Sequence, residues 1–282
     1  MENPRIAVIG AGLMGTGIAQ VILEAGFHVS LVDVSADQLE NSKGKIYSFL
    51  NRKVEKGEID KEYVNSCIER FTTFNSFESV TDTEFVIEAV PERLELKKQI
   101  FKKLDEVINQ NAIFISNTSG LSISDIASVT NRPEQVIGMH FFFPVPKMGL
   151  VEIIKGVLTS DFVYDKVKKL SEQIGKNAVD APNYPGFLVN RVLVPMINEA
   201  IYCVMEGAKP EDVDAAMKLG ANHPMGPIQL ADFVGLDTLL ATMQGLYEGF
   251  RDSKYRPCPL LINLVEGGQL GRKTGRGFYT YK

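Results

Sequence analysis

The chain has 282 residues, of which 45% are apolar and 23% are charged, and its formal net charge is −5 at pH 7. This length favours two domains, and the mixed composition excludes a disordered chain or a tandem repeat. The acidic balance excludes a general electrostatic attraction for nucleic acid. The three cysteines, Cys67, Cys203 and Cys258, lie too far apart in sequence for a zinc site or a disulfide framework.

The first apolar run covers residues 6–9 and ends at Gly10. A run of this length is too short for a signal peptide or a membrane span. We therefore expect a cytoplasmic protein that has neither a membrane nor a nucleic acid as its partner.

A strand, a glycine-rich turn, a helix and a second strand follow one another at the start of the chain. Residues 5–9 are typical of a buried parallel strand. Apolar side chains then recur at helical spacing over residues 18–25, and Gly26 is placed to end that helix. Residues 28–34 alternate as a second strand and carry Asp33 near its end. A dinucleotide-binding fingerprint requires this order of elements.

The turn reads Gly10-Ala11-Gly12-Leu13-Met14-Gly15. Gly10 permits a tight turn, Gly12 lets backbone N–H groups approach a pyrophosphate, and Gly15 lets the helix pack closely on the strand. Asp33 could accept hydrogen bonds from both ribose hydroxyls of an adenosine. Its charge would repel the 2′-phosphate of NADP by about 1–4 kcal/mol at about 4 Å. The motif therefore indicates NAD, and a glycine turn in an unrelated α/β fold is the alternative.

Further apolar strands are predicted at residues 84–90, 112–116 and 136–140, with helices at 94–108 and 124–130 between them. This alternation predicts a doubly wound parallel sheet. Ligands of such sheets bind at the carboxyl ends of the strands. The polar candidates follow those ends: Glu92, Asn117, Ser119 and His140.

Residues 42–70 form an insertion that is charged and helical in pattern, with Gly57 as a break, and we expect a helical hairpin. Its function could be to clamp a phosphate-bearing substrate, and the alternative is a solvated helix face. The first arm is basic through Lys43, Lys45, Arg52, Lys53 and Lys56.

His140 is the strongest candidate for chemistry, because it ends a predicted strand and Glu152 follows twelve residues later. A histidine with a carboxylate partner and nearby hydroxyl groups is typical of a general base. An imidazole, whose ordinary pKa is about 6.5, populates both protonation states at working pH. On the structural alternatives, His140 only supports the strand end, Glu152 only begins a strand, and Ser119 only caps a helix.

The alternation of strands and helices stops near residue 184, so we expect domains at 1–184 and 185–282. The second domain is predicted to be all-α, with helices at 187–205, 210–219 and 227–247 and a short one at 260–266. The first of these is apolar nearly all round, so it needs cover from its own domain or from a second subunit. We therefore expect a homodimer.

With these residues identified, the chain resembles the short-chain L-3-hydroxyacyl-CoA dehydrogenase family, and within it the bacterial 3-hydroxybutyryl-CoA dehydrogenases. The resemblance runs nearly end to end and rests on several ordered motifs. These are Val8–Gly15, Ser116–Ser119, Gly138–Phe142, Val151–Ile154, Pro185–Arg191, Leu219–Pro227 and Gly271–Tyr279.

The resemblance implies a Rossmann-type domain and a reversible, NAD-dependent oxidation of (S)-3-hydroxybutyryl-CoA to acetoacetyl-CoA. His140 would be the base and Glu152 would orient it. Ser119 and Asn190 would contact the substrate's 3-hydroxyl and thioester carbonyl. The remaining family positions are Glu92, Lys97 and Asn117 for NAD, and Arg52 and Lys56 for the CoA moiety of an acyl-CoA substrate.

Three positions depart from the family pattern. Phe143 stands where an asparagine is usual, Gly120 replaces a common serine, and Gly149 replaces a common lysine. Phe143 removes a polar contact expected near the nicotinamide, whereas the proposed base and its partner are unchanged. Two other functions stay open. One is a sugar-acid dehydrogenase of the gulonate type, and the other is a non-catalytic, crystallin-like NAD-binding protein.

Overall fold

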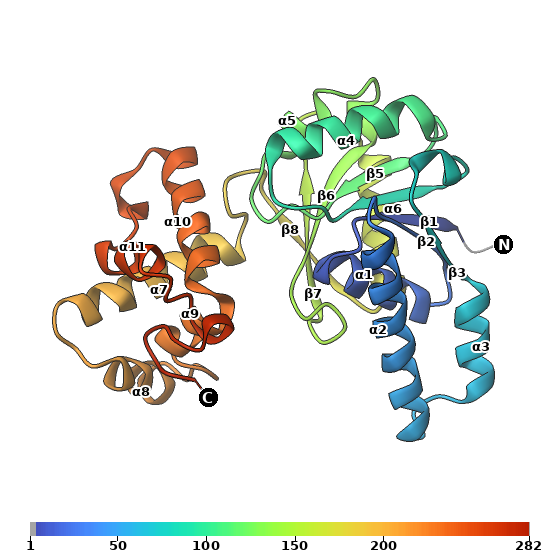
Figure 1. Ribbon diagram of the computed structural model, residues 1–282. Helices are drawn as coiled ribbons and strands as arrows, with labels where there is room; N and C mark the ends of the chain where they lie inside the picture. Colours follow the sequence, from blue (N-terminus) through green and yellow to red (C-terminus); the bar gives the residue numbers. More distant parts are fainter. Residues whose placement is uncertain (1–3, 282) are drawn as a thin grey trace. The chain divides into compact units, whose positions relative to one another are not determined.

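The computed structural model describes residues 4–281, which form two compact units (Figure 1). The first unit ends at Asn183 and the second begins at Tyr184. Each unit has its own apolar core. The first contains a sheet covered by helices, and the second is built from helices.

The sheet of the first unit has eight strands in the order β3-β2-β1-β4-β5-β6-β7-β8. All neighbouring strands are parallel except β6 and β7, which are antiparallel. The strand order reverses its direction between β1 and β4, the position where such sheets bind ligands. The strands are β1 (Arg5–Ile9), β2 (His28–Val32), β3 (Phe71–Phe74), β4 (Phe85–Glu88), β5 (Ile113–Ser116), β6 (Val136–Phe141), β7 (Leu150–Lys155) and β8 (Asn177–Ala181).

This sheet confirms the predicted fold class, because it is doubly wound and mostly parallel. The central strands are buried on both faces, as their continuous apolar runs predicted. Helices α1 (Leu13–Glu24) and α6 (Asp161–Gln173) pack on one face, where the main core cluster lies. Helices α4 (Leu94–Val107) and α5 (Ile123–Ala127) cover the other face (Figure 1), where the rings of Phe101 and Phe114 meet edge to face at 6.0 Å.

The helices of the first unit begin mostly at side-chain caps. Ser35 caps α2 by accepting a hydrogen bond from the Gln38 N–H, and Asp60 caps α3 through the Tyr63 N–H. The predicted hairpin is therefore present, but its first helix begins at Ala36 rather than at residue 42. Figure 1 shows α2 and α3 extending away from the sheet. The helices are α1 (Leu13–Glu24), α2 (Ala36–Glu55), α3 (Lys61–Glu69), α4 (Leu94–Val107), α5 (Ile123–Ala127) and α6 (Asp161–Gln173), with 3-10 turns η1 (Phe77–Ser79) and η2 (Pro133–Gln135).

In the second unit, the prediction of one helix over residues 227–247 is wrong. Two helices occupy this region, because Gly235 has φ +101°, a backbone conformation that ends one helix before the next begins. Residues 184–281 contain isolated β-bridges but no β-strand. The helices are α7 (Val189–Met205), α8 (Pro210–Gly220), α9 (Pro227–Val234), α10 (Leu236–Phe250) and α11 (Pro259–Glu266), with 3-10 turns η3 (Ser253–Tyr255) and η4 (Arg272–Thr274).

Two buried carboxylates tie the last residues of the second unit to its helices. Asp232 accepts hydrogen bonds from the N–H groups of Phe278 and Tyr279 and from the Tyr281 hydroxyl. Asp214 accepts from the Tyr279 hydroxyl at 2.7 Å. Burial, together with the bond to Asp232, raises the pKa of Tyr281 to about 12. The Gly271–Tyr279 motif therefore forms part of this unit's structure.

The glycines of the β1–α1 turn differ in the space around them. Gly10 has φ +103°, and a Cβ there would lie 2.8 Å from the carbonyl oxygen of Ala89. A Cβ on Gly15 would collide with the carbonyl oxygen of Gly10. Gly12 has no such neighbour within 4 Å. The expected tight turn at Gly10 and close packing at Gly15 are therefore confirmed.

A buried ion pair fixes the end of α4. The Arg132 Nε lies 2.6 Å from Asp105 Oδ1, and both side chains are 4% exposed. The guanidinium also donates to the carbonyl oxygens of Asp105, Ile108 and Asn109, which have no partner within the helix. Burial alone would raise the pKa of the Asp105 carboxyl, but N–H donors of Asn131 and Arg132 hold it below its ordinary value.

Replacing Asp105 by asparagine should lower the free energy of unfolding by about 3–5 kcal/mol at pH 7, because Arg132 loses its buried partner. A carboxyl with a depressed pKa stabilises the fold above its unfolded pKa of about 3.9, and this contribution disappears as the pH falls through the folded pKa. Urea unfolding of both proteins should therefore give a difference that shrinks below about pH 4. A difference that stays constant down to acid pH would contradict this account.

Alanine substitutions should separate the tasks of Gly15 and Gly12. Gly15→Ala should destabilise the protein by about 1–3 kcal/mol, since the new methyl group overpacks the turn. Gly12→Ala should change stability much less and weaken NADH binding, because its methyl group occupies the space expected for a pyrophosphate. Thermal unfolding without ligand and NADH fluorescence titration measure the two effects. Equal losses of stability would remove the distinction.

Candidate active site

His140 and Glu152 face each other across the antiparallel pair β6–β7. The register pairs them directly, so both side chains lie on the same face of the sheet. His140 Nδ1 lies 2.7 Å from Glu152 Oε2, and the residues are 6% and 0% exposed. When Nδ1 donates to the carboxylate, the neutral ring carries its lone pair on Nε2. Glu152 is the third residue of β7, so it does not begin the strand as the structural alternative supposed.

The loop between these strands is anchored by a lysine that the sequence analysis missed. Lys176 donates its amine to the carbonyl oxygens of Val145 and Met148 at 2.6 and 2.7 Å. Burial lowers the pKa of this amine. The loop also packs on α1, where a Cβ on Gly17 would lie 2.9 Å from Val145. Phe142, at the start of the loop, has its ring centroid 4.4 Å from that of His140.

Ser119 follows β5 and contacts Glu92, which follows β4. Glu92 Oε1 accepts hydrogen bonds from the Ser119 N–H at 2.8 Å and from the Ser119 hydroxyl at 3.1 Å. The same oxygen accepts from the Thr118 hydroxyl at 2.5 Å. Asn117 binds the neighbouring strand instead, because its Oδ1 accepts the Phe141 N–H at 2.9 Å. The carboxyl ends of β4, β5 and β6 are thus joined by side chains.

Lys97 lies beside Glu92, and its side chain is buried, with only 1% exposed. Its amine is 2.7 Å from Glu88 Oε1 and 3.2 Å from Glu92 Oε2. Glu88 was not identified from the sequence, although a single acidic residue ending the apolar strand β4 was an available signal. The structure therefore brings Glu92, Lys97 and Ser119 together and adds Glu88 to them.

Asp33 follows β2 and closes on the glycine turn. One carboxylate oxygen accepts the Ala11 N–H at 2.7 Å, and the other accepts the Ser35 N–H at 2.9 Å. A cavity of 730 Å³ opens beside Asp33 and is also lined by Gly10 and Val90. It is separate from a second cavity of 590 Å³ in the same unit. The glycine turn, the acid and the cavity beside Asp33 fit the adenosine and pyrophosphate of a dinucleotide.

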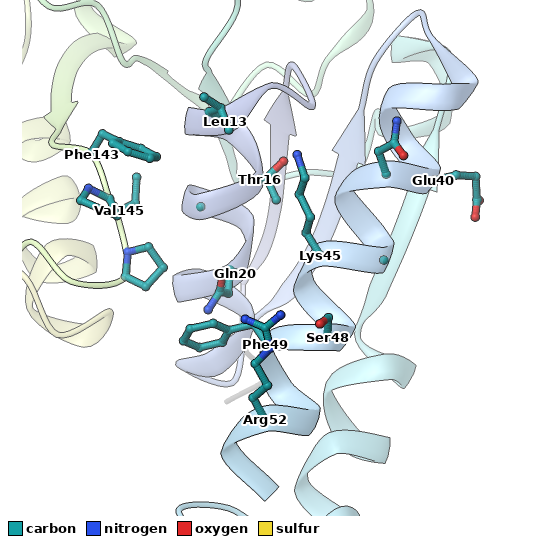
Figure 2. A pocket seen from close by; sticks show the side chains of 15 residues that line it. Leu13, Thr16, Gln20, Glu40, Lys45, Ser48, Phe49, Arg52, Phe143 and Val145 are labelled. Atoms are coloured by element: carbon teal, nitrogen blue, oxygen red, sulfur yellow. The ribbon is translucent and has the colours of Figure 1, made fainter. Parts of the chain in front are cut away.

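The 590 Å³ cavity is a groove between α1, α2 and the loop over residues 143–146 (Figure 2). Lys45 and Arg52 line it from α2, and Arg52 lies beside Phe49 in Figure 2. Phe143 forms part of the opposite wall and is 55% exposed. Lys53 pairs with Glu24 of α1, and Lys56 caps the end of α2 outside the groove lining. The basic arm is therefore only partly directed into the groove.

Asn190 belongs to the second unit, where it is the second residue of α7, and its expected contact with substrate stays a prediction. Across residues 4–281, no group of three or more histidine, cysteine, aspartate or glutamate side chains could hold a metal ion. No helix within the same residues is long and apolar enough to cross a membrane.

Comparison with known proteins identifies the chain's relatives. Residues 5–184 match the family model for the 3-hydroxyacyl-CoA dehydrogenase NAD binding domain, and residues 186–281 match its C-terminal domain. A Bacillus subtilis protein named as a probable 3-hydroxybutyryl-CoA dehydrogenase is 51% identical over 100% of this chain and 99% of its own length. The 3-hydroxybutyryl-CoA dehydrogenase of Bradyrhizobium diazoefficiens is 49% identical over 99% of this chain and 95% of its own.

Among solved structures, (S)-3-hydroxybutyryl-CoA dehydrogenase from Ralstonia eutropha superposes with a TM-score of 0.96, at 45% identity and with 100% of both chains covered. The protein is an oxidoreductase that uses NAD, and its first domain provides the cofactor site. The chain belongs to the 3-hydroxyacyl-CoA dehydrogenase family.

Proposed function

We propose that the protein interconverts (S)-3-hydroxybutyryl-CoA and acetoacetyl-CoA. The observation that carries this proposal is the buried pair of His140 and Glu152, 2.7 Å apart at the carboxyl end of β6. The names of relatives that are 46–51% identical support the substrate class. Two alternatives were a gulonate-type dehydrogenase and a non-catalytic NAD-binding protein. Family membership favours neither of them over the 3-hydroxybutyryl-CoA substrate proposed here.

His140 acts as the general base in this proposal. Its Nε2 takes the proton of the 3-hydroxyl while the hydride leaves C3, which turns the alcohol into a ketone. NAD, when bound, supplies the hydride acceptor. Glu152 holds the ring in one tautomer and stabilises the imidazolium that forms, as a buried carboxylate does for a neighbouring cation. Base catalysis of this kind is worth about 10²–10⁴-fold in rate.

Ser119 and Asn190 are proposed as the polar contacts of the substrate, with its 3-hydroxyl and its thioester carbonyl. Donors placed near a carbonyl stabilise the negative charge that develops on its oxygen in the transition state. Ser119 follows the carboxyl end of β5, the strand beside the one that carries His140, which favours its contact with the same substrate. Arg52 and Lys56 are proposed to contact the CoA moiety, and the groove position of Arg52 supports its part.

The cofactor contacts are proposed along the carboxyl edge of the sheet. Asp33 beside the 730 Å³ cavity favours NAD over NADP, since its carboxylate would repel a 2′-phosphate. The proposed contacts are Gly10, Gly12, Leu13, Met14, Gly15, Asp33, Glu92, Lys97, Asn117, Ser119 and His140.

We also propose domains at 1–184 and 185–282, the second of which helps to bind substrate and forms a cytoplasmic homodimer. Helix α7 buries Ile197 and Ile201 inside its own unit, whereas Val192 is 72% exposed. In the proposed homodimer, a second subunit would cover this exposed apolar side of α7.

His140→Ala should lower kcat by about 10²–10⁴-fold, because the reaction loses its proton acceptor, while NADH still binds. Stopped-flow oxidation of NADH with acetoacetyl-CoA and fluorescence titration of NADH measure the two effects. His28→Ala is the matched control. His28 is the first residue of β2 and therefore lies at the amino ends of the parallel strands, away from His140, so this variant should keep full turnover. Near-full turnover in His140→Ala would refute the proposed mechanism.

Arg52→Ala and Lys56→Ala should raise KM for acetoacetyl-CoA more than KM for acetoacetyl-pantetheine, because the shorter ester lacks the phosphates that the cations attract. Lys61→Ala, at the exposed start of α3, is the control and should change neither constant. The same assay with a free keto acid tests the sugar-acid alternative. Equal changes for both esters would return the two residues to the role of a solvated helix face.

A further inference from the structure

Glu88 is a fully buried carboxylate for which the proposed mechanism has no use. It ends β4, is 0% exposed, and lies opposite Ser116 in the register of β4 and β5. One oxygen accepts the Val90 N–H at 2.8 Å and the Lys97 amine at 2.7 Å. The other oxygen accepts the Ser116 hydroxyl at 2.7 Å. All of these contacts are with groups inside the protein.

Lys97 connects Glu88 to Glu92. It is 1% exposed, and a buried ammonium group is unfavourable unless anions and acceptors surround it. Its amine meets Glu88 at 2.7 Å, Glu92 at 3.2 Å and the carbonyl oxygen of Val90 at 3.4 Å. The ammonium group therefore donates hydrogen bonds to Glu88 and Val90 and forms an ion pair with Glu92.

Glu92 connects Lys97 to Ser119 through its two carboxylate oxygens. The Oε2 atom of Glu92 faces Lys97, whereas its Oε1 atom accepts from the N–H and the hydroxyl of Ser119. The side chain of Glu92 is 40% exposed, so its own burial does not fix its conformation. The buried pair beneath it restricts where its carboxylate can lie.

We propose that Glu88 is a positioning residue that acts through Lys97 and Glu92 to place Ser119. This inference rests on the proposed function, in which Ser119 contacts the substrate. The negative charge of Glu88 balances that of the buried Lys97 amine, and the amine holds Glu92 in the orientation that binds Ser119. Without the charge of Glu88, the amine moves toward Glu92. This movement alters the position of the Glu92 carboxylate and, with it, that of Ser119.

Glu88→Gln is the sharpest variant, because glutamine has nearly the same shape and can keep the hydrogen bonds. Its amide oxygen can accept from Val90 and Lys97, and its NH₂ group can donate to the Ser116 hydroxyl. The negative charge alone is removed. We expect kcat for acetoacetyl-CoA reduction to fall about 10–100-fold, the usual consequence of a misplaced active-site group.

A double-mutant cycle with Ser119→Ala tests whether Glu88 works through Ser119. Ser119→Ala should itself lower kcat, and adding Glu88→Gln should then cause no further loss, because the positioned hydroxyl is already gone. If Glu88→Gln lowers kcat by the same factor in both backgrounds, its effect does not pass through Ser119 and the inference is overturned. Full kcat in Glu88→Gln alone overturns it too.

The cycle also separates this inference from the proposed function. Full activity in Ser119→Ala would overturn the substrate contact together with the positioning that depends on it. A loss in Ser119→Ala with additive losses in the cycle would leave the contact in place and overturn the positioning alone.

Asp105→Asn is the matched control, since it also removes the charge of a buried carboxylate from an ion pair, the one with Arg132. It should lower the thermal midpoint without lowering the kcat of the folded enzyme. If Glu88→Gln does not fold, Glu88→Asp takes its place, because it keeps the buried charge but withdraws the carboxylate from Lys97. The same cycle with Ser119→Ala then applies, with the same deciding outcomes.

Discussion

The antiparallel pairing of β6 and β7 is the constraint on which the site depends. A parallel sheet brings the carboxyl ends of its strands to one edge, so the last residues of β6 reach that edge. Because β7 runs in the opposite direction, its first residues return to the same edge. Glu152, third in β7, therefore meets His140, which is the second-last residue of β6. A parallel β7 would place its first residues at the far edge, away from His140.

Burial makes this pair strong, and the neighbouring strands keep it in place. Hydrogen bonds gain strength where water is excluded, and an unpaired polar group in the same place is costly. Several polar side chains at this edge are bonded to a group on the next strand or loop. Asn117 holds the end of β6, and Lys176 holds the loop that leads to β7. The positions of His140 and Glu152 thus depend mainly on backbone spacing, which is about 4.8 Å between adjacent strands.

The sequence allowed the first βαβ unit and the candidate residues to be predicted, because apolar runs and the glycine turn depend on local physics. The edge strands β3 and β8 were missed, because both strands are short and most of their residues are polar or exposed. Gly235 breaks a helix by a positive φ that a helical apolar pattern does not reveal. Lys97 carried an available signal, because it occupies a buried position on the same face of α4 as Phe101 and Leu104. A charge at an apolar position of a helix indicates a buried partner, which here is Glu88.

The buried charges also explain how a chain of net charge −5 can bind anionic ligands. Overall attraction is absent, so the binding of an anion must come from local donors, such as the N–H groups at the start of a helix. Acidic side chains close to such a site would repel phosphates unless they were neutralised or turned away. Lys97 lies between Glu88 and Glu92. The carboxylate oxygens of Asp33 accept hydrogen bonds from the N–H groups of Ala11 and Ser35. These acids therefore shape the site through hydrogen bonds, while their negative charge is partly compensated within the protein.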